Sequence, residues 1–167
     1  ALTDADGARV YRSGCPSGGS VELLIEPFSP APRLRIWGAT AIAEALAALG
    51  AVLRLRVERG EADGGPLGPQ DAAVVATQGH GDAAALRAAL DGGAGFVGMV
   101  ASRRKAAALR ARLEREAADP ARLAAIESPV GLAIGAAEPE EIAVSILAAL
   151  VARRRATGQE ADRAAGC

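Results

Sequence analysis

The stretch Leu34-Arg35-Ile36-Trp37-Gly38-Ala39-Thr40-Ala41-Ile42-Ala43 decides the fold of this chain. Its first four residues form a short extended run, and Ala41–Leu49, rich in Ala and Leu, is typical of a helix. A strand that passes into a helix through a tight glycine turn is the opening unit of a doubly wound α/β fold. We therefore predict that such a fold begins at this segment.

Extended and helical patterns alternate along the chain after this opening unit. We predict further strands at Val52–Val57, Ala72–Ala76, Gly95–Val100 and Val130–Ile134. We predict further helices at Ala83–Leu90, Lys105–Ala118, Pro120–Ile126 and Pro139–Arg153. Strands that alternate with helices form βαβ units, whose right-handed crossovers make the sheet parallel. The sequence therefore predicts the α/β class: a Rossmann-like, doubly wound parallel sheet with a short N-terminal β-hairpin region.

A proline-rich segment divides the chain. Pro27, Pro30 and Pro32 disfavour both helix and strand, and before them Val10–Glu26 has the pattern of two short extended runs around a glycine-rich turn. We interpret residues 1–32 as an N-terminal β segment and linker, the remnant of a first domain. Residues 33–155 form the predicted Rossmann-like domain, and residues 156–167 a frayed tail.

The composition excludes several classes of function. The 167 residues carry 19 Lys plus Arg against 20 Asp plus Glu, whereas nucleic-acid-binding domains usually carry an excess of positive charge. One His and two Cys are too few for a zinc cluster of His and Cys ligands. Two cysteines in a chain of this length favour a reducing, cytoplasmic setting. No apolar run approaches the roughly 18–20 residues of a membrane span.

In open α/β sheets the ligand lies beyond the carboxyl ends of the strands, so the turns after the strands are the candidate site. Gly38-Ala39-Thr40 stands where dinucleotide-binding folds carry G-x-G-x-x-G, with Thr40 in place of the middle Gly. Glu58 follows Gly38 by 20 residues, the spacing at which an acid binds ribose hydroxyls. These residues predict a nucleotide site. The alternative is a tight turn without nucleotide and a solvated Glu58.

The predicted strand Ala72–Ala76 is followed by a polar, glycine-rich turn. Thr77, Gln78 and His80 offer hydroxyl, amide and imidazole groups that can hydrogen-bond a polar ligand. Asp82 is the expected N-cap of the next helix. His80, the one histidine, is either a proton donor or base, or a surface residue.

Two further candidates lie outside this turn. Ser102 can cap the helix that follows the strand Gly95–Val100, and the free N–H groups there, with Arg103, predict an anion site. The alternative is a solvated basic first turn. Cys15, in the N-terminal glycine-rich turn, is either a reactive thiolate or soft-metal ligand, or an inert turn residue.

Seven segments share their pattern with one known family: Cys15–Glu22, Ile25–Pro27, Ile36–Ala39, Val75–His80, Val97–Lys105, Ser128–Ala136 and Pro139–Leu147. Together they resemble the XdhC/CoxI family, over about residues 13–153. The most specific parts are the Ser-Arg-Arg run at 102–104 and the Pro-Val-Gly-Leu-Ala-Ile-Gly-Ala run at 129–136. The resemblance implies an accessory protein for molybdenum hydroxylases such as xanthine dehydrogenase and carbon monoxide dehydrogenase.

The resemblance implies a maturation chaperone rather than an enzyme with a reaction of its own. Members bind the molybdenum cofactor, often as a pterin dinucleotide such as molybdopterin cytosine dinucleotide, and assist its sulfuration and insertion into the apo-enzyme. At matching positions it implies cofactor contacts for Gly38, Ala39, Thr77 and the 102–104 run, and an approach of Cys15 to the metal. Thr40 stands where the family usually has Gly, and Ala133 where it usually has Asp.

The implied partners are the apo molybdenum hydroxylase and a cysteine desulfurase. A homodimer is a further expectation, because the Ala-rich last helix can bury against a second copy. Two alternatives stay open. One is an NAD(P)-binding oxidoreductase with His80 as proton donor, and the other is a protein-docking module that binds no nucleotide.

Overall fold

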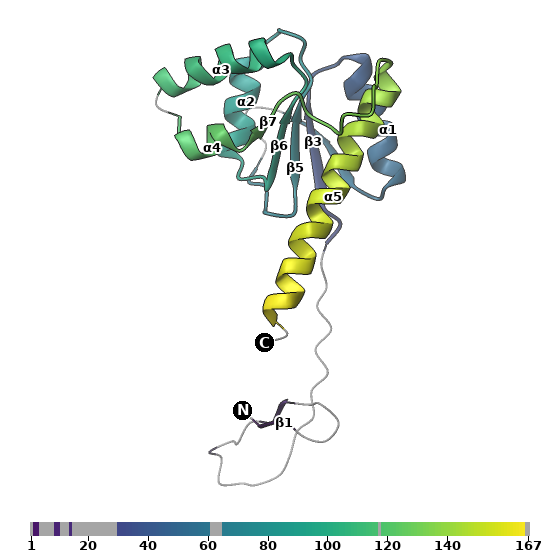
Figure 1. Ribbon diagram of the computed structural model, residues 1–167, viewed down its shortest axis with the longest axis vertical. Coiled ribbons are helices and arrows are strands. Elements are labelled where there is room, and N and C mark those ends of the chain that lie inside the picture. Colours follow the sequence, from purple (N-terminus) through teal and green to yellow (C-terminus); the bar gives the residue numbers. More distant parts are fainter. Residues whose placement is uncertain are drawn as a thin grey trace.

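A computed structural model of the chain describes residues 2–3, 9–10, 14, 30–60, 65–116 and 118–165 (Figure 1). The strands are β1 (Leu2–Thr3), β2 (Arg9–Val10), β3 (Arg33–Trp37), β4 (Arg56–Arg59), β5 (Ala72–Val75), β6 (Phe96–Met99) and β7 (Ile126–Glu127). The helices are α1 (Ala41–Val52), α2 (Asp82–Asp91), α3 (Arg103–Arg115), α4 (Pro120–Ala124) and α5 (Pro139–Ala165). From β3 onward helices lie between the strands as predicted, except that the described residues between β4 and β5 hold no helix.

The main sheet has five parallel strands in the order β4-β3-β5-β6-β7. The chain leaves β3 toward β4 on one side and then returns to the other side, where β5, β6 and β7 follow. The strand order therefore reverses between β3 and β5, which is the point where doubly wound sheets bind their ligands. The predicted Rossmann-like α/β fold is confirmed.

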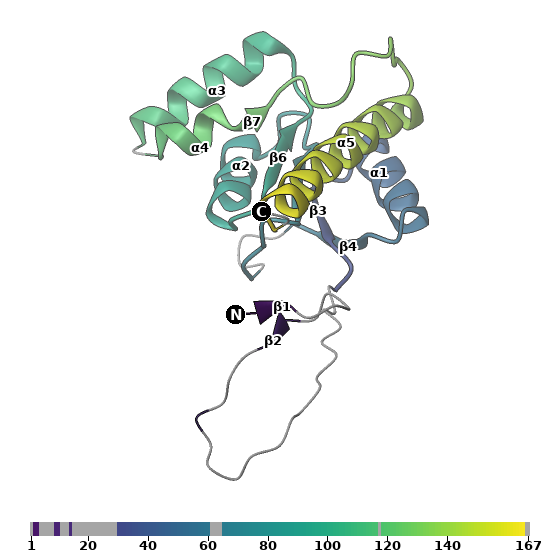
Figure 2. The ribbon, with the colours of Figure 1, turned by 60° about the horizontal axis from the view of Figure 1, so that its bottom comes forward.

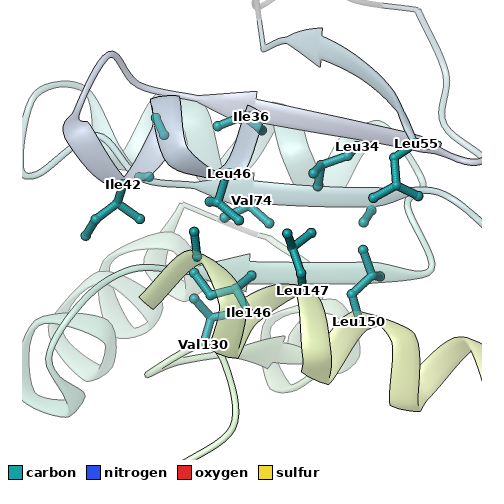
Figure 3. Packing of buried hydrophobic residues seen from close by; sticks show 14 of the residues in the cluster. Leu34, Ile36, Ile42, Leu46, Leu55, Val74, Val130, Ile146, Leu147 and Leu150 are labelled. Carbon is teal, nitrogen blue, oxygen red and sulfur yellow. The ribbon is translucent and has the colours of Figure 1, made fainter. Parts of the chain in front are cut away.

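Helices cover both faces of the sheet, with α1 and α5 on one face and α2, α3 and α4 on the other (Figures 1 and 2). Strand β5 supplies apolar side chains to both faces, and all four of its residues are buried. A strand buried on both faces needs such a continuous apolar run. Figure 3 shows Val74 of β5 between Leu46 of α1 and Ile146 and Leu147 of α5, in one of the two halves of the core.

One buried charge interrupts this apolar pattern on β3, which lies between β4 and β5. Arg35 is 4% exposed and lies on the face of the sheet that carries α2. Its guanidinium binds the Glu58 carboxylate at 2.8 Å and the carbonyl oxygen of Gly65 at 2.8 Å. The described residues between β4 and β5 (60 and 65–71) contain no helix. This loop and Glu58 therefore satisfy the charge where an apolar helix would otherwise pack.

Two predicted strands were wrong in position. Residues 52–57 do not form one strand, because α1 continues to Val52, Arg54 has a left-handed φ of 57°, and β4 begins at Arg56. The last strand is β7, not Val130–Ile134. Pro129 has no N–H for a strand ladder, and Gly131 has a φ of 108°, which ends extended backbone there.

The helix α5 runs to Ala165, beyond the predicted end near Arg153, and its C-terminal part extends past the sheet (Figure 1). The segment after Arg153 holds no proline, so nothing in it stops the helix abruptly. Most of the predicted extended segment Val10–Glu26, with Cys15, lies outside the described residues; β1 pairs with β2, which ends at Val10, the first residue of that segment. No helix in the described part of the chain is long and apolar enough to cross a membrane.

Candidate functional site

A cleft of about 600 Å³ lies beyond the carboxyl ends of β3, β4 and β5, at the point where the strand order reverses. Its volume is in the range of small-molecule sites, roughly 300–1,000 Å³. Its lining comes from the turns after these strands and from one side of α2: Trp37, Gly38, Ala39, Thr40, Gly60, Thr77, His80, Gly81, Ala84, Ala85 and Ala88. Of the residues predicted for the site, it therefore brings together Gly38, Ala39, Thr40, Thr77 and His80.

The turn between β3 and α1 is closed by contacts within the protein. Gly38 has a φ of 117°, and a Cβ placed there would lie 2.3 Å from the carbonyl oxygen of Ala76, so only glycine fits. The Thr40 hydroxyl accepts from the N–H of Ala43 at 3.2 Å and donates to the carbonyl oxygen of Ala76 at 3.0 Å. Thr40 therefore caps α1 and ties this turn to the end of β5.

The end of β4 contributes a glycine to the cleft. A Cβ on Gly60 would lie 2.1 Å from the ring of Trp37, so the backbone of Gly60 packs directly on the indole. Neighbouring Arg59 forms an ion pair with Glu44 of α1 at 2.7 Å. At this edge the cleft is bounded by backbone and an aromatic ring.

Glu58 is not part of the cleft lining. Its carboxylate binds Arg35 at 2.8 Å and Arg56 at 2.9 Å. Burial raises the pKa of Glu58, but the hydrogen bonds from Arg35 and Arg56 outweigh it and hold the pKa below its usual value. Both carboxylate oxygens thus have arginine partners. A ribose diol could bind Glu58 only by replacing these two bonds.

The turn between β5 and α2 is organised by one carboxylate. Asp82, which is 8% exposed, accepts hydrogen bonds from the Thr77 hydroxyl and from the N–H of Gly79 at 2.9 Å. Its second oxygen binds the Lys105 ammonium of α3 at 2.5 Å. Burial raises the pKa of Asp82, but its bonds to Lys105, Thr77 and Gly79 outweigh this and lower the pKa. Asp82 is therefore a carboxylate at neutral pH.

The predicted capping role of Asp82 was wrong. Asp82 is the first residue of α2, and the N-cap is Gly81, with a φ of 79°. Since glycine has no side chain, the first turn of α2 has no side-chain cap in the described structure. Thr40 and Ser102 by contrast cap α1 and α3. The N–H groups of the first turn of α2 therefore have no capping side chain among the described residues, and the Asp82 carboxylate lies at the same end of the helix.

The remaining predicted residues lie apart from the cleft lining. Gln78 is exposed, with a left-handed φ of 49°, in the same turn as Thr77. Ser102 caps α3 by accepting from the N–H of Lys105 at 3.3 Å, as predicted, and Arg103 is exposed beside it. Cys15 lies outside the described residues. In the part of the chain that the structure describes, no group of three His, Cys, Asp or Glu could hold a metal ion.

Sequence reasoning missed half of the cleft. It did not find Trp37, nor the residues that supply small or backbone surfaces: Gly60, Gly81 and the alanines on one side of α2, Ala84, Ala85 and Ala88. Gly60 and Gly81 did carry a signal, because a glycine follows β4 and precedes α2. The alanines carried none, because Ala is common throughout this chain and only packing selects these three.

Fold and cleft together define a Rossmann-like α/β domain with a ligand-sized crevice at the switch point of a parallel sheet. The model of the XdhC Rossmann domain matches residues 34–150, which is more than half of the chain. The chain therefore belongs to the XdhC family, and the family resemblance of its sequence is confirmed.

One solved structure gives an independent view of the fold. A xanthine dehydrogenase from Bacillus halodurans is similar to the chain with a TM-score of 0.66 at 23% sequence identity. The likeness covers 80% of this chain and 47% of that one, so this chain spans about half the length of that protein. The likeness supports the fold. No protein among the curated ones matches the chain.

Proposed function

We propose that this chain is the nucleotide-binding part of an accessory protein for molybdenum hydroxylases. Its cleft holds the nucleotide end of the molybdenum cofactor, in a pterin dinucleotide form, as cargo for sulfuration and insertion into an apo-hydroxylase. Membership of the XdhC family supports this, as does the fold shared with a protein named as a xanthine dehydrogenase. The observation that carries the proposal is the cleft between β3 and β5, with the N-terminus of α2 in its wall.

The residues present fit a nucleotide better than they fit a reaction. The lining is made largely of Gly and Ala, which let a flat base and a phosphate approach the backbone. None of the described lining residues is Lys or Arg, so a phosphate there is bound by backbone N–H groups at the start of α2. The cofactor itself supplies the redox chemistry once it is in the hydroxylase. The role of this chain is to bind and release it.

The bonding of Glu58 argues against the NAD(P) alternative. In NAD-binding folds an acid at the end of the second strand accepts hydrogen bonds from the ribose hydroxyls. Here the corresponding acid is bonded to Arg35 and Arg56 and does not line the cleft. An oxidoreductase would also need a proton donor. The one titratable side chain in the described lining is His80, so this alternative depends on that exposed residue alone.

The test is a calorimetric titration of the reduced protein with molybdopterin cytosine dinucleotide, and with NAD and NADP in separate runs. We expect binding of the pterin dinucleotide alone. Binding of NAD or NADP alone would favour the oxidoreductase, and no binding in any run would favour the docking module.

Matched variants locate the binding site. Ala84→Phe places a ring in the cleft and is expected to weaken binding at least about tenfold, whereas Ala107→Phe on the exposed side of α3 leaves it unchanged. Arg103→Ala separates the anion site proposed at α2 from the one predicted at Arg103: since Arg103 is not in the lining, we expect unchanged affinity. A loss in Arg103→Ala with no loss in Ala84→Phe would move the site to the N-terminus of α3.

A further inference from the structure

The two threonines of the cleft, Thr40 and Thr77, both donate their hydroxyl hydrogen to a protein oxygen. A threonine hydroxyl has one hydrogen to donate and two lone pairs that accept. The Thr40 hydroxyl gives its hydrogen to the carbonyl oxygen of Ala76. The Thr77 hydroxyl gives its hydrogen to the Asp82 carboxylate. An ionised carboxylate can only accept, so the direction of this second bond is fixed.

Thr77 is held in this state by Asp82, which itself has three partners. Asp82 keeps its position through the N–H of Gly79 and the ammonium of Lys105 in addition to Thr77. Because Asp82 is 8% exposed, water competes little for these bonds. To present its hydrogen to a ligand, Thr77 would have to leave a buried carboxylate with one bond fewer, which is unfavourable.

The cleft is therefore divided into two kinds of surface. Donors lie at the start of α2, where backbone N–H groups have no side-chain cap in the described structure. At the end of β5, half-buried Thr77 offers a lone pair. A phosphate oxygen or a carbonyl suits the first surface and is repelled at the second. An O–H or N–H group suits the second.

We propose that Thr77, held by Asp82 and Lys105, is a specificity-determining residue of the cleft, which accepts a hydrogen bond from an O–H or N–H donor of the bound nucleotide. The inference rests on the proposed function, because it needs a nucleotide in the cleft. The donor has two possible sources, a ribose hydroxyl or the amino group of the base. Both present the same chemistry to Thr77, and different ligands separate them.

The experiment compares three ligands by calorimetry on the whole chain: cytidine diphosphate, 2′,3′-dideoxycytidine diphosphate and uridine diphosphate. The second lacks both ribose hydroxyls, and the third has a carbonyl in place of the amino group. We expect cytidine diphosphate to bind about three- to tenfold more tightly than one of the other two, as for the loss of a neutral hydrogen bond. The weaker ligand identifies the source.

Variants at position 77 decide whether Thr77 causes the preference. Thr77→Val keeps the shape but has no lone pair, and we expect it to bind all three ligands alike. Thr77→Ser keeps the hydroxyl and is expected to restore the preference, which a merely structural role would not require. Equal binding of the three ligands by the unmodified protein, or a preference that persists in Thr77→Val, would overturn the inference.

Molybdopterin cytosine dinucleotide, measured alongside, separates this inference from the proposed function. If the protein binds that ligand but fails any of the tests above, or binds none of the three diphosphates, the inference on Thr77 is wrong and the proposed function stands. If the protein binds neither that ligand nor the diphosphates, both are wrong.

Discussion

Two strand-to-helix turns border the cleft, and they end in opposite states. The turn from β3 to α1 uses Thr40 to cap its helix and to bind the end of β5. In the turn from β5 to α2 the one carboxylate, Asp82, binds Thr77, Gly79 and Lys105. The N-cap of α2 is Gly81, which provides no side-chain cap. The first turn, at the position of the dinucleotide fingerprint, is thus closed by its own side chain, whereas the backbone N–H groups at the second have no side-chain cap in the described structure.

This difference gives the threonine at position 40 a meaning. In a dinucleotide fingerprint the middle glycine allows the backbone to approach a pyrophosphate. A side chain there blocks that approach, and here it also satisfies an N–H of α1. The Thr40 side chain at one turn and the uncapped start of α2 at the next together support the proposal that a phosphate binds at α2 rather than at α1.

The largest expected effect is at Gly38. Gly38→Ala places a Cβ 2.3 Å from the carbonyl oxygen of Ala76 in left-handed backbone, and we expect a loss of about 3 kcal/mol or more in the free energy of unfolding. Gly81→Ala is the matched control in the other turn, because its φ is 79° but no atom lies within 4 Å of the added Cβ. There we expect a loss of only about 1 kcal/mol. Urea unfolding measures both, and equal losses would show that the two turns do not differ in packing.

The second effect is at Thr40. Thr40→Val removes the cap of α1 and leaves the carbonyl oxygen of buried Ala76 without this donor, so we expect a loss of about 2 kcal/mol in the free energy of unfolding. Thr40→Ser keeps both bonds and is expected to lose much less. Ligand binding should survive in Thr40→Ser. A stable Thr40→Val protein would mean that the first turn does not depend on its cap.

The third effect depends on pH. Asp82 has a lowered pKa in the folded protein, so it contributes stability above its unfolded pKa, about 3.9, and loses it as the pH falls through the folded value. Asp82→Asn gives up the charge, and we expect it to be about 1 kcal/mol less stable at pH 7. This gap should shrink as the pH falls below about 4. Unfolding at pH 7, 5 and 3 measures it, and a gap that stays constant with pH would contradict the ionised Asp82.

The smallest expected effect is at Ser102, the N-cap of α3. Ser102 caps α3 at an exposed position with a 3.3 Å bond, so Ser102→Ala should lose about 0.5–1 kcal/mol in the free energy of unfolding. Because Ser102 does not line the cleft, nucleotide affinity should not change. A change in affinity without a change in stability would place α3 in the site.

The fold and the list of turns followed from local sequence. The run at Leu34–Ala43 predicts strand, turn and helix, and β3 and α1 lie there. The errors came where two local patterns compete. Apolar and polar residues alternate over 53–57 as in a strand. Leu55 is nevertheless buried because the chain turns at Arg54, after the end of α1. Whether a short apolar run is strand or turn depends on which residues pack on it.

The sequence by itself determined the α/β class, the family, and the strand ends at which a ligand would bind, because hydrophobic period and glycine position are local properties. Only the tertiary structure decided how the polar residues at those ends are used. Glu58 stands at the right spacing for a ribose, but the buried charge of Arg35 on the neighbouring strand binds it. Asp82 has the sequence position of an N-cap, but its two oxygens are bonded to Thr77 and Lys105. A carboxylate binds the donors that folding brings nearest to it, and two of these donors, Arg35 and Lys105, lie on other elements of the fold.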